Sequence, residues 1–166
     1  MTDTQTTKSA DETINFARMF ASTLKRNDIV ALMGELGSGK TQFVKGICKY
    51  FDVRGIVSSP TFVLMHRYEG ADNASSEIFI YHLDLYRISS PAQVLDLGYE
   101  EVFRGNGIAL IEWAENLGNL MPPNRIEVLM SLGSAENERT IAIRRFAEDP
   151  SVRPVSPIRS GKEVQA

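Results

Sequence analysis

Residues 34–41 read GELGSGKT and combine the residue types that bind phosphate groups. Their spacing follows the phosphate-loop pattern of Gly, four residues, Gly, Lys, then Ser or Thr. The glycines permit backbone angles that let successive N–H groups surround an anion. Lys40 would contact the outer phosphates, and the Thr41 hydroxyl would coordinate a Mg²⁺ ion that also bridges phosphate oxygens. The loop therefore predicts a nucleoside triphosphate site, contacted by Glu35, Leu36, Gly37, Ser38, Gly39, Lys40 and Thr41.

The segments on either side of this loop have the character that a phosphate loop requires. An apolar run over residues 29–33 predicts a strand before it. Thr41 opens a predicted helix, whose N-terminus adds N–H donors and a partial positive charge. Apolar residues recur at helical spacing along that helix, at Phe43, Val44, Ile47, Cys48 and Phe51. The alternative is a glycine-rich turn that binds nothing, and it requires neither flanking element.

Two acidic residues are candidates for the chemistry that follows binding. Asp84 lies near the end of a predicted strand over residues 77–86, and Glu112 follows the apolar run 108–111. Open α/β sheets bind ligands at the carboxyl ends of their strands, where an acid would organise Mg²⁺ and the attacking water. The alternative for each acid is a solvent-facing carboxylate at the end of a strand.

The segment SSPTF, residues 58–62, is a candidate switch segment. Pro60 restricts Ser59 to an extended backbone. The Thr61 hydroxyl could then reach Mg²⁺ or a γ-phosphate, as hydroxyls of switch segments do. An ordinary turn leading into a strand is the alternative reading of the same residues.

Three further side chains have less specific signals. We expect His66 and His82 to be half-exposed strand residues, because neither has histidine or cysteine neighbours at zinc-ligand spacing. Trp113 follows Glu112 directly and is either a core residue or an aromatic surface beside the nucleotide or a partner.

The elements that position these residues mix one strand, loop and helix unit with two hairpins. Ser9 and Glu12 predict a capped helix, with Ile14, Ala17, Phe20, Ala21 and Leu24 on its buried face. Hairpins are predicted from strands 61–68 and 77–86, and from strands 125–132 and 139–146. Between them lie a short helix, opened by Ser90, Pro91 and Gln93 and ended by Gly98, and a strand over residues 107–113. This order predicts an α/β, P-loop NTPase-like three-layer domain with a mixed parallel and antiparallel sheet.

Length and composition limit the domain organisation and the class of partner. The 166 residues, 43% of them hydrophobic, suit one domain over residues 9–146, with a flexible N-terminus at 1–8 and a disordered tail at 147–166. The formal charge of -3 argues against a protein that grips nucleic acid through its own surface. The single cysteine, the polar N-terminus and the absence of a long apolar run predict a cytoplasmic protein without a disulfide or a membrane span.

Five stretches occur in a specific order: GELGSGKT, SSPTF, YHLDLYR, LGYEEVF and LIEWAE. Together they resemble the TsaE family, also called YjeE, the small bacterial ATPases of tRNA threonylcarbamoyladenosine biosynthesis. The resemblance implies that the protein binds ATP with Mg²⁺ and works with the TsaB and TsaD proteins, which attach a threonylcarbamoyl group to adenosine 37 of tRNA. It also implies that ATP hydrolysis resets this assembly between rounds, and that tRNA is met only indirectly, through the complex.

The resemblance assigns roles to six of the candidate residues. It implies that Lys40 and Thr41 hold the phosphates and Mg²⁺, and that Glu112 is the second Mg²⁺ contact. Asp84 is similar to the family acid needed for activity. Thr61 would belong to the mobile switch, and Trp113 to the adjoining functional surface.

Two other classes of protein share the phosphate loop. A small-molecule kinase would need a second substrate pocket and usually an arginine-rich lid, which we do not find in the sequence. A GTPase-like switch would normally carry an Asn-Lys-x-Asp guanine reader, and the nearest stretch, NRIE at residues 124–127, does not supply one.

Overall fold

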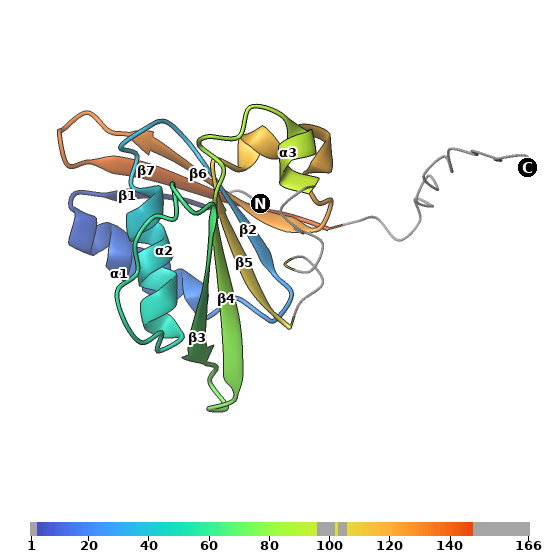
Figure 1. Cartoon of the computed structure of the whole chain (residues 1–166). Helices are drawn as coiled ribbons and strands as arrows, with labels where there is room; N and C mark the ends of the chain where they lie inside the picture. Colours follow the sequence, from blue (N-terminus) through green and yellow to red (C-terminus); the bar gives the residue numbers. More distant parts are fainter. Residues whose placement is uncertain (1–2, 96–101, 103–105, 148–166) are drawn as a thin grey trace, which may run out of the picture.

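A seven-stranded mixed sheet forms the centre of the molecule (Figure 1). The computed structural model describes residues 3–95, 102 and 106–147. The strands are β1 (Asp3–Thr7), β2 (Ile29–Met33), β3 (Met65–Ala71), β4 (Glu77–Asp84), β5 (Gly107–Glu112), β6 (Arg125–Leu132) and β7 (Arg139–Phe146), and their order is β1-β7-β6-β2-β5-β4-β3. β2 is parallel to β5 and β6, and β4 is parallel to β5, whereas the outer pairs are antiparallel. The predicted α/β fold with a mixed sheet is confirmed.

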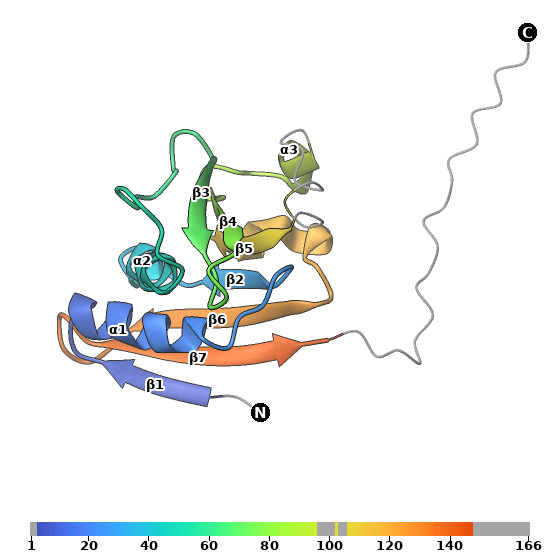
Figure 2. The ribbon, with the colours of Figure 1, turned by 90° about the horizontal axis from the view of Figure 1, so that it is seen from below.

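Helices cover both faces of this sheet. They are α1 (Ala10–Ala21), α2 (Lys40–Tyr50), α3 (Pro91–Leu95) and the 3-10 helix η1 (Ala114–Leu120). Figures 1 and 2 show α1 and α2 side by side, away from α3. Because side chains alternate along a strand, β2 divides the core. Val30 and Leu32 pack with α1 and α2, while Ile29 and Ala31 pack with α3 and η1. The arrangement is therefore three layers.

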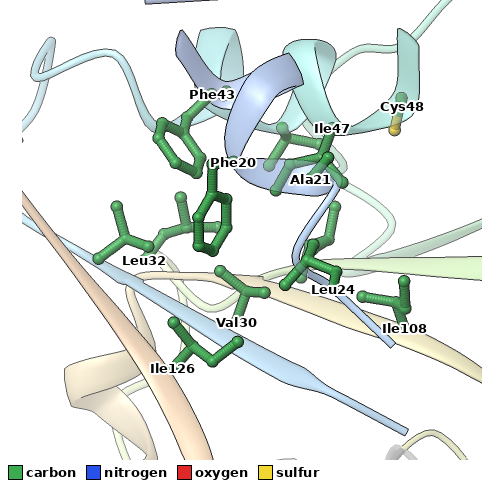
Figure 3. Close-up of a cluster of buried hydrophobic side chains, with 14 of the residues drawn as sticks. Phe20, Ala21, Leu24, Val30, Leu32, Phe43, Ile47, Cys48, Ile108 and Ile126 are labelled. Atoms are coloured by element: carbon green, nitrogen blue, oxygen red, sulfur yellow. The ribbon is translucent and has the colours of Figure 1, made fainter. Parts of the chain in front are cut away.

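The contact between α1 and α2 is close enough to require a glycine. A Cβ atom at Gly46 would lie 2.3 Å from the carbonyl oxygen of Ile14 and 2.6 Å from the Cβ of Ala17. Phe20 and Phe43 fill the space between the two helices and β2, with ring centroids 5.5 Å apart (Figure 3). Cys48 lies in the same cluster, and burial raises the pKa of its thiol to about 12. This packing fixes α2, whose first residues belong to the phosphate loop.

The start of α1 follows the predicted capping pattern. The Ser9 hydroxyl accepts a hydrogen bond from the backbone N–H of Glu12 at 3.1 Å, and the Glu12 carboxylate accepts one from the N–H of Lys8 at 2.7 Å. The first bond satisfies a backbone donor that a helix leaves free at its first turn, and the second attaches the residue before the N-cap to the helix. The helix therefore begins where the sequence indicates.

The expected flexible N-terminus at residues 1–8 is wrong for residues 3–7, because they form the strand β1. Asp3–Thr7 pairs antiparallel with β7, and Thr7 is opposite Arg139. The sequence DTQTT gives no apolar signal, because an edge strand is held through backbone hydrogen bonds that any residue can make. The hydroxyls of Thr7 and Thr13, 2.8 Å apart, also join β1 to α1.

Three predicted strands are shorter than the sequence suggested at one end. The strand expected at residues 61–68 begins only at Met65, because the N–H of Leu64 bonds to the carbonyl oxygen of Pro60 and Leu64 has a left-handed φ of 67°. β4 ends at Asp84 and not at 86. β5 ends at Glu112, since Trp113 has a φ of 57°. Each boundary falls beside a candidate site residue.

Some predictions fall partly or wholly outside the described residues. Gly98, most of the LGYEEVF stretch and the tail from residue 148 onward belong to this group. Among the helices that the structure describes, none combines the length and the apolar character needed to cross a membrane.

The α1 and α2 contact yields a stability prediction. Gly46→Val should lower the free energy of unfolding by about 1–3 kcal/mol, because its side chain would push α1 off α2. The control is Lys49→Ala, an exposed position on the same helix, which we expect to change stability by less than about 0.5 kcal/mol. Urea unfolding measures both. Equal stability of the two variants would contradict the tight contact.

Candidate nucleotide site

The phosphate loop leaves β2 and lies directly on β6. A Cβ atom at Gly34 would be 2.0 Å from the carbonyl oxygen of Met130, so a larger residue does not fit there. Gly34, Gly37 and Gly39 have φ values of 137°, 79° and 98°, a region that favours glycine. Gly39 is also the N-cap of α2. The loop thus has the backbone conformation that an anion-binding turn requires, ahead of a helix N-terminus.

Lys40 is folded back over this loop. Its Nζ donates to the carbonyl oxygens of Gly34 at 2.7 Å and Glu35 at 2.9 Å, and lies 4.0 Å from the centroid of the Trp113 ring. Burial lowers the pKa of Lys40, although the carboxylates of Glu112, Glu115, Asp84 and Glu35 oppose this shift. The ammonium therefore holds the loop carbonyls and interacts electrostatically with the acids that end β4 and β5.

Thr41 and Glu112 join the start of α2 to the end of β5. The Thr41 hydroxyl donates to the two carboxylate oxygens of Glu112, at 2.8 Å to Oε1 and 3.1 Å to Oε2. Glu112 is only 3% exposed. The alternative of a solvent-facing carboxylate is therefore wrong for Glu112. Two oxygen-bearing side chains meet at the position where the sequence predicts magnesium.

Asp84 occupies the matching position on the neighbouring strand. It is paired with Glu112 in the β4 and β5 register and is also 3% exposed, so it does not face solvent either. Its Oδ2 accepts hydrogen bonds from the hydroxyls of Ser59 at 2.5 Å and Thr61 at 2.6 Å. Its Oδ1 accepts the backbone N–H of Tyr86 at 2.9 Å. The segment 58–62 is therefore attached to the acid that ends β4.

A cavity of about 520 Å³ connects these groups. The predicted site residues that line this cavity are Leu36, Gly37, Gly39, Lys40, Thr41, Thr61, Asp84, Glu112 and Trp113. Glu35 and Ser38 do not line it. The Glu35 carboxylate accepts a hydrogen bond from the N–H of Leu132 on β6, and Ser38 is buried within the loop. The volume lies in the range of small-molecule sites, about 300–1,000 Å³.

The cavity has further walls that the sequence did not indicate. Ala10 and Thr13 come from the start of α1, Asn137 from the turn between β6 and β7, and Arg139 from the start of β7. The Arg139 guanidinium donates to the carbonyl oxygen of Gly37 at 3.2 Å. Asn137 and Arg139 reach the loop because β6 pairs with β2 and β7 pairs with β6, an order for which no local pattern gives a signal.

The two histidines differ in their surroundings. His66 is half-buried, as expected, and its Nδ1 lies 3.1 Å from the Tyr68 hydroxyl. His82 contradicts the expectation of half-exposure, because it is fully buried and its Nε2 lies 2.9 Å from Glu112 Oε1. The sequence of β4 indicates a strand, in which alternate side chains share a face. It does not indicate that the face with His82 is packed against α2.

The donor set suits Mg²⁺ held together with phosphate. Among the described residues, no group of three or more His, Cys, Asp and Glu side chains is arranged to hold a metal ion alone. The Thr41 hydroxyl and the Glu112 carboxylate are hard oxygen donors, and Mg²⁺ is usually bound by one or two carboxylates and by substrate phosphates. The site fits a metal ion that arrives with a nucleotide.

Comparisons with known proteins point to one family. The family model for the threonylcarbamoyl adenosine biosynthesis protein TsaE matches residues 7–141. The tRNA threonylcarbamoyladenosine biosynthesis protein TsaE of Rickettsia typhi is 43% identical over 141 residues, which cover 84% of this chain and 93% of that protein. The protein of the same name from Bacillus subtilis is 33% identical over 135 residues, covering 81% and 80%.

A solved structure has a similar fold. The crystal structure of Bacillus subtilis YdiB superposes with a TM-score of 0.72 at 28% sequence identity, covering 89% of this chain and 87% of that one. The match to the TsaE family model extends from the end of β1 into β7 and includes the phosphate loop and the acids Asp84 and Glu112. The chain belongs to the TsaE family of threonylcarbamoyladenosine biosynthesis proteins.

Proposed function

We propose that this protein binds ATP with Mg²⁺ and hydrolyses it in threonylcarbamoyladenosine modification of tRNA. The observation that carries the proposal is the meeting of Thr41, Glu112 and Asp84 at one cavity with the phosphate loop. A phosphate loop alone explains binding, whereas a buried acid beside the outer phosphates supports turnover. In this proposal Lys40 neutralises charge on the β- and γ-phosphates, and Thr41 and Glu112 hold the metal ion.

Asp84 is the proposed general base, which accepts a proton from the attacking water. When bound, Mg²⁺ would neutralise charge on the phosphate oxygens. The Asp84 carboxylate takes a proton from water as the water oxygen bonds to the γ-phosphorus, and the bond to the bridging oxygen breaks to leave ADP and phosphate. Ser59 and Thr61 hold Asp84 Oδ2 by hydrogen bonds, so these hydroxyls must move before that oxygen meets water. Slow hydrolysis by the protein alone is the expected consequence.

The walls of the cavity beyond the phosphate loop suit the nucleoside. Ala10, Thr13, Asn137 and Arg139 line the cavity and lie outside the loop. We assign the ribose and adenine to this part of the cavity. The NRIE stretch begins β6, and Ile126 pairs with Val30 near the start of β2, so it lies at the edge opposite the loop. Nothing in the described residues favours a guanine reader.

The proposed partners are the TsaB and TsaD proteins. Hydrolysis would reset their assembly after each modification, and tRNA would be met only through that assembly. The formal charge of -3 supports this division, because a protein that gripped tRNA itself would need clustered positive charge. Trp113 and Thr61 both line the cavity, which supports a functional surface there.

The role of Lys40 yields a prediction about binding. Lys40→Ala should weaken ATP affinity by about 10- to 100-fold, because hydrogen bonds to a charged group contribute about 1.5–3 kcal/mol. Lys45→Ala on the same helix is the matched control and should bind as the wild type does. Calorimetric titration with Mg²⁺ and ATP measures both. Unchanged affinity in Lys40→Ala would refute its role in phosphate binding.

The role of Asp84 yields a prediction about turnover and resetting. Asp84→Asn should keep ATP affinity but lose hydrolysis in the presence of TsaB and TsaD by at least about 100-fold, because the amide cannot take a proton. The control is Asp52→Asn, an exposed position after α2. With purified TsaB and TsaD, wild-type protein should support many rounds of tRNA modification and Asp84→Asn about one. Wild-type hydrolysis by the variant would refute the role of Asp84, and repeated rounds without any hydrolysis would refute the reset role.

A further inference from the structure

His82 interrupts a row of apolar side chains in the core. Ile78, Ile80, His82 and Asp84 share the face of β4 that α2 covers, and the two isoleucines belong to the core cluster of α1 and α2. His82 is 0% exposed. A polar ring in such a position loses its contacts with water, which costs free energy unless a protein group replaces them. An aliphatic residue would continue the row without that cost.

Glu112 is the group that replaces those contacts. His82 Nε2 lies 2.9 Å from Glu112 Oε1, and because a carboxylate accepts hydrogen bonds, Nε2 is the donor. The other ring nitrogen, Nδ1, is buried and has no hydrogen-bond partner among the described residues. Within the part of the chain that the structure describes, the hydrogen bond of this buried ring is therefore directed at the carboxylate.

The contact is not needed to hold β4 and β5 together. Their parallel ladder extends over six residue pairs, from Phe79 with Gly107 to Asp84 with Glu112. What the imidazole adds is orientation of the Glu112 carboxylate. The Thr41 hydroxyl at the start of α2 donates to both carboxylate oxygens, and His82 on the neighbouring strand β4 donates to Oε1. Two donors from different elements fix the plane of the carboxylate more firmly than one.

We propose that His82 is a positioning residue, which orients the Glu112 carboxylate for the metal ion that enters with the nucleotide. This inference rests on the proposed function of Glu112. Mg²⁺ tolerates little departure from octahedral geometry, so a freely turning carboxylate would bind it less well. Residues that hydrogen-bond to metal ligands typically change metal affinity by about 10- to 100-fold when they are replaced.

The test measures metal binding and does not depend on turnover. Mn²⁺ is titrated into the protein saturated with ADP, and free Mn²⁺ is followed by electron paramagnetic resonance. His82→Leu should weaken Mn²⁺ binding by about 10- to 100-fold. His82→Gln should restore most of it, because its amide nitrogen is as many bonds from Cα as Nε2. ADP affinity in EDTA should stay unchanged in both variants. The matched control is His66→Leu, which should bind Mn²⁺ normally. His66 lies opposite His82 on the neighbouring strand, and its ring is hydrogen-bonded to Tyr68.

The other outcomes separate this inference from the proposed function. If Glu112→Gln leaves Mn²⁺ affinity unchanged, the metal role of Glu112 fails. If Glu112→Gln weakens Mn²⁺ binding but His82→Leu does not, only the positioning role is overturned. Equal losses in the Leu and Gln variants, with equal losses of thermal stability, would mean a structural role and also overturn it. If His82→Leu does not fold, His82→Asn takes its place, since its amide is one bond too short to reach Glu112 as Gln does.

Discussion

The hydrogen bonds between Thr41 and Glu112 join the two halves of the site, and the surrounding architecture serves to bring these residues together. Thr41 is the second residue of α2, and Glu112 is the last residue of β5. Because β2 and β5 are parallel neighbours, the loop that leaves β2 and the acid that ends β5 lie at the same edge of the sheet. The tight contact of α1 with Gly46 fixes the position of α2, whose residue Thr41 lies within hydrogen-bond distance of Glu112.

The same parallel arrangement explains why the acids are buried and paired. β4 lies beside β5 in a register that brings Asp84 level with Glu112. Each acid is held by hydroxyl donors, Asp84 by Ser59 and Thr61 and Glu112 by Thr41, with His82 behind it. Hydrogen bonds to an ionised group compensate for lost hydration. Two carboxylates therefore line the cavity, and the segment 58–62 is hydrogen-bonded to one of them, Asp84.

The sequence was sufficient for the parts of the site that depend on short-range patterns. The loop, the strand ends carrying Asp84 and Glu112, and the second hairpin all follow from spacing over a few residues. The edge strand β1 could not be predicted, because backbone pairing with β7 leaves no mark on side-chain pattern. The walls at Thr13 and Arg139, and the burial of His82, depend on which elements pack together across the fold. Those arrangements arise from sheet order and layer packing, which local periodicity does not encode.

The central claim is that this edge of the sheet binds ATP through Mg²⁺ held by Thr41 and Glu112. The most direct measurement is a crystal structure of the protein with Mg²⁺ and a non-hydrolysable ATP analogue. We expect Thr41 Oγ1 and a Glu112 oxygen at about 2.1 Å from the ion, with the triphosphate on the loop and the adenine near Thr13 and Asn137. A metal ion bound by other residues, or a nucleotide outside the cavity, would contradict this account.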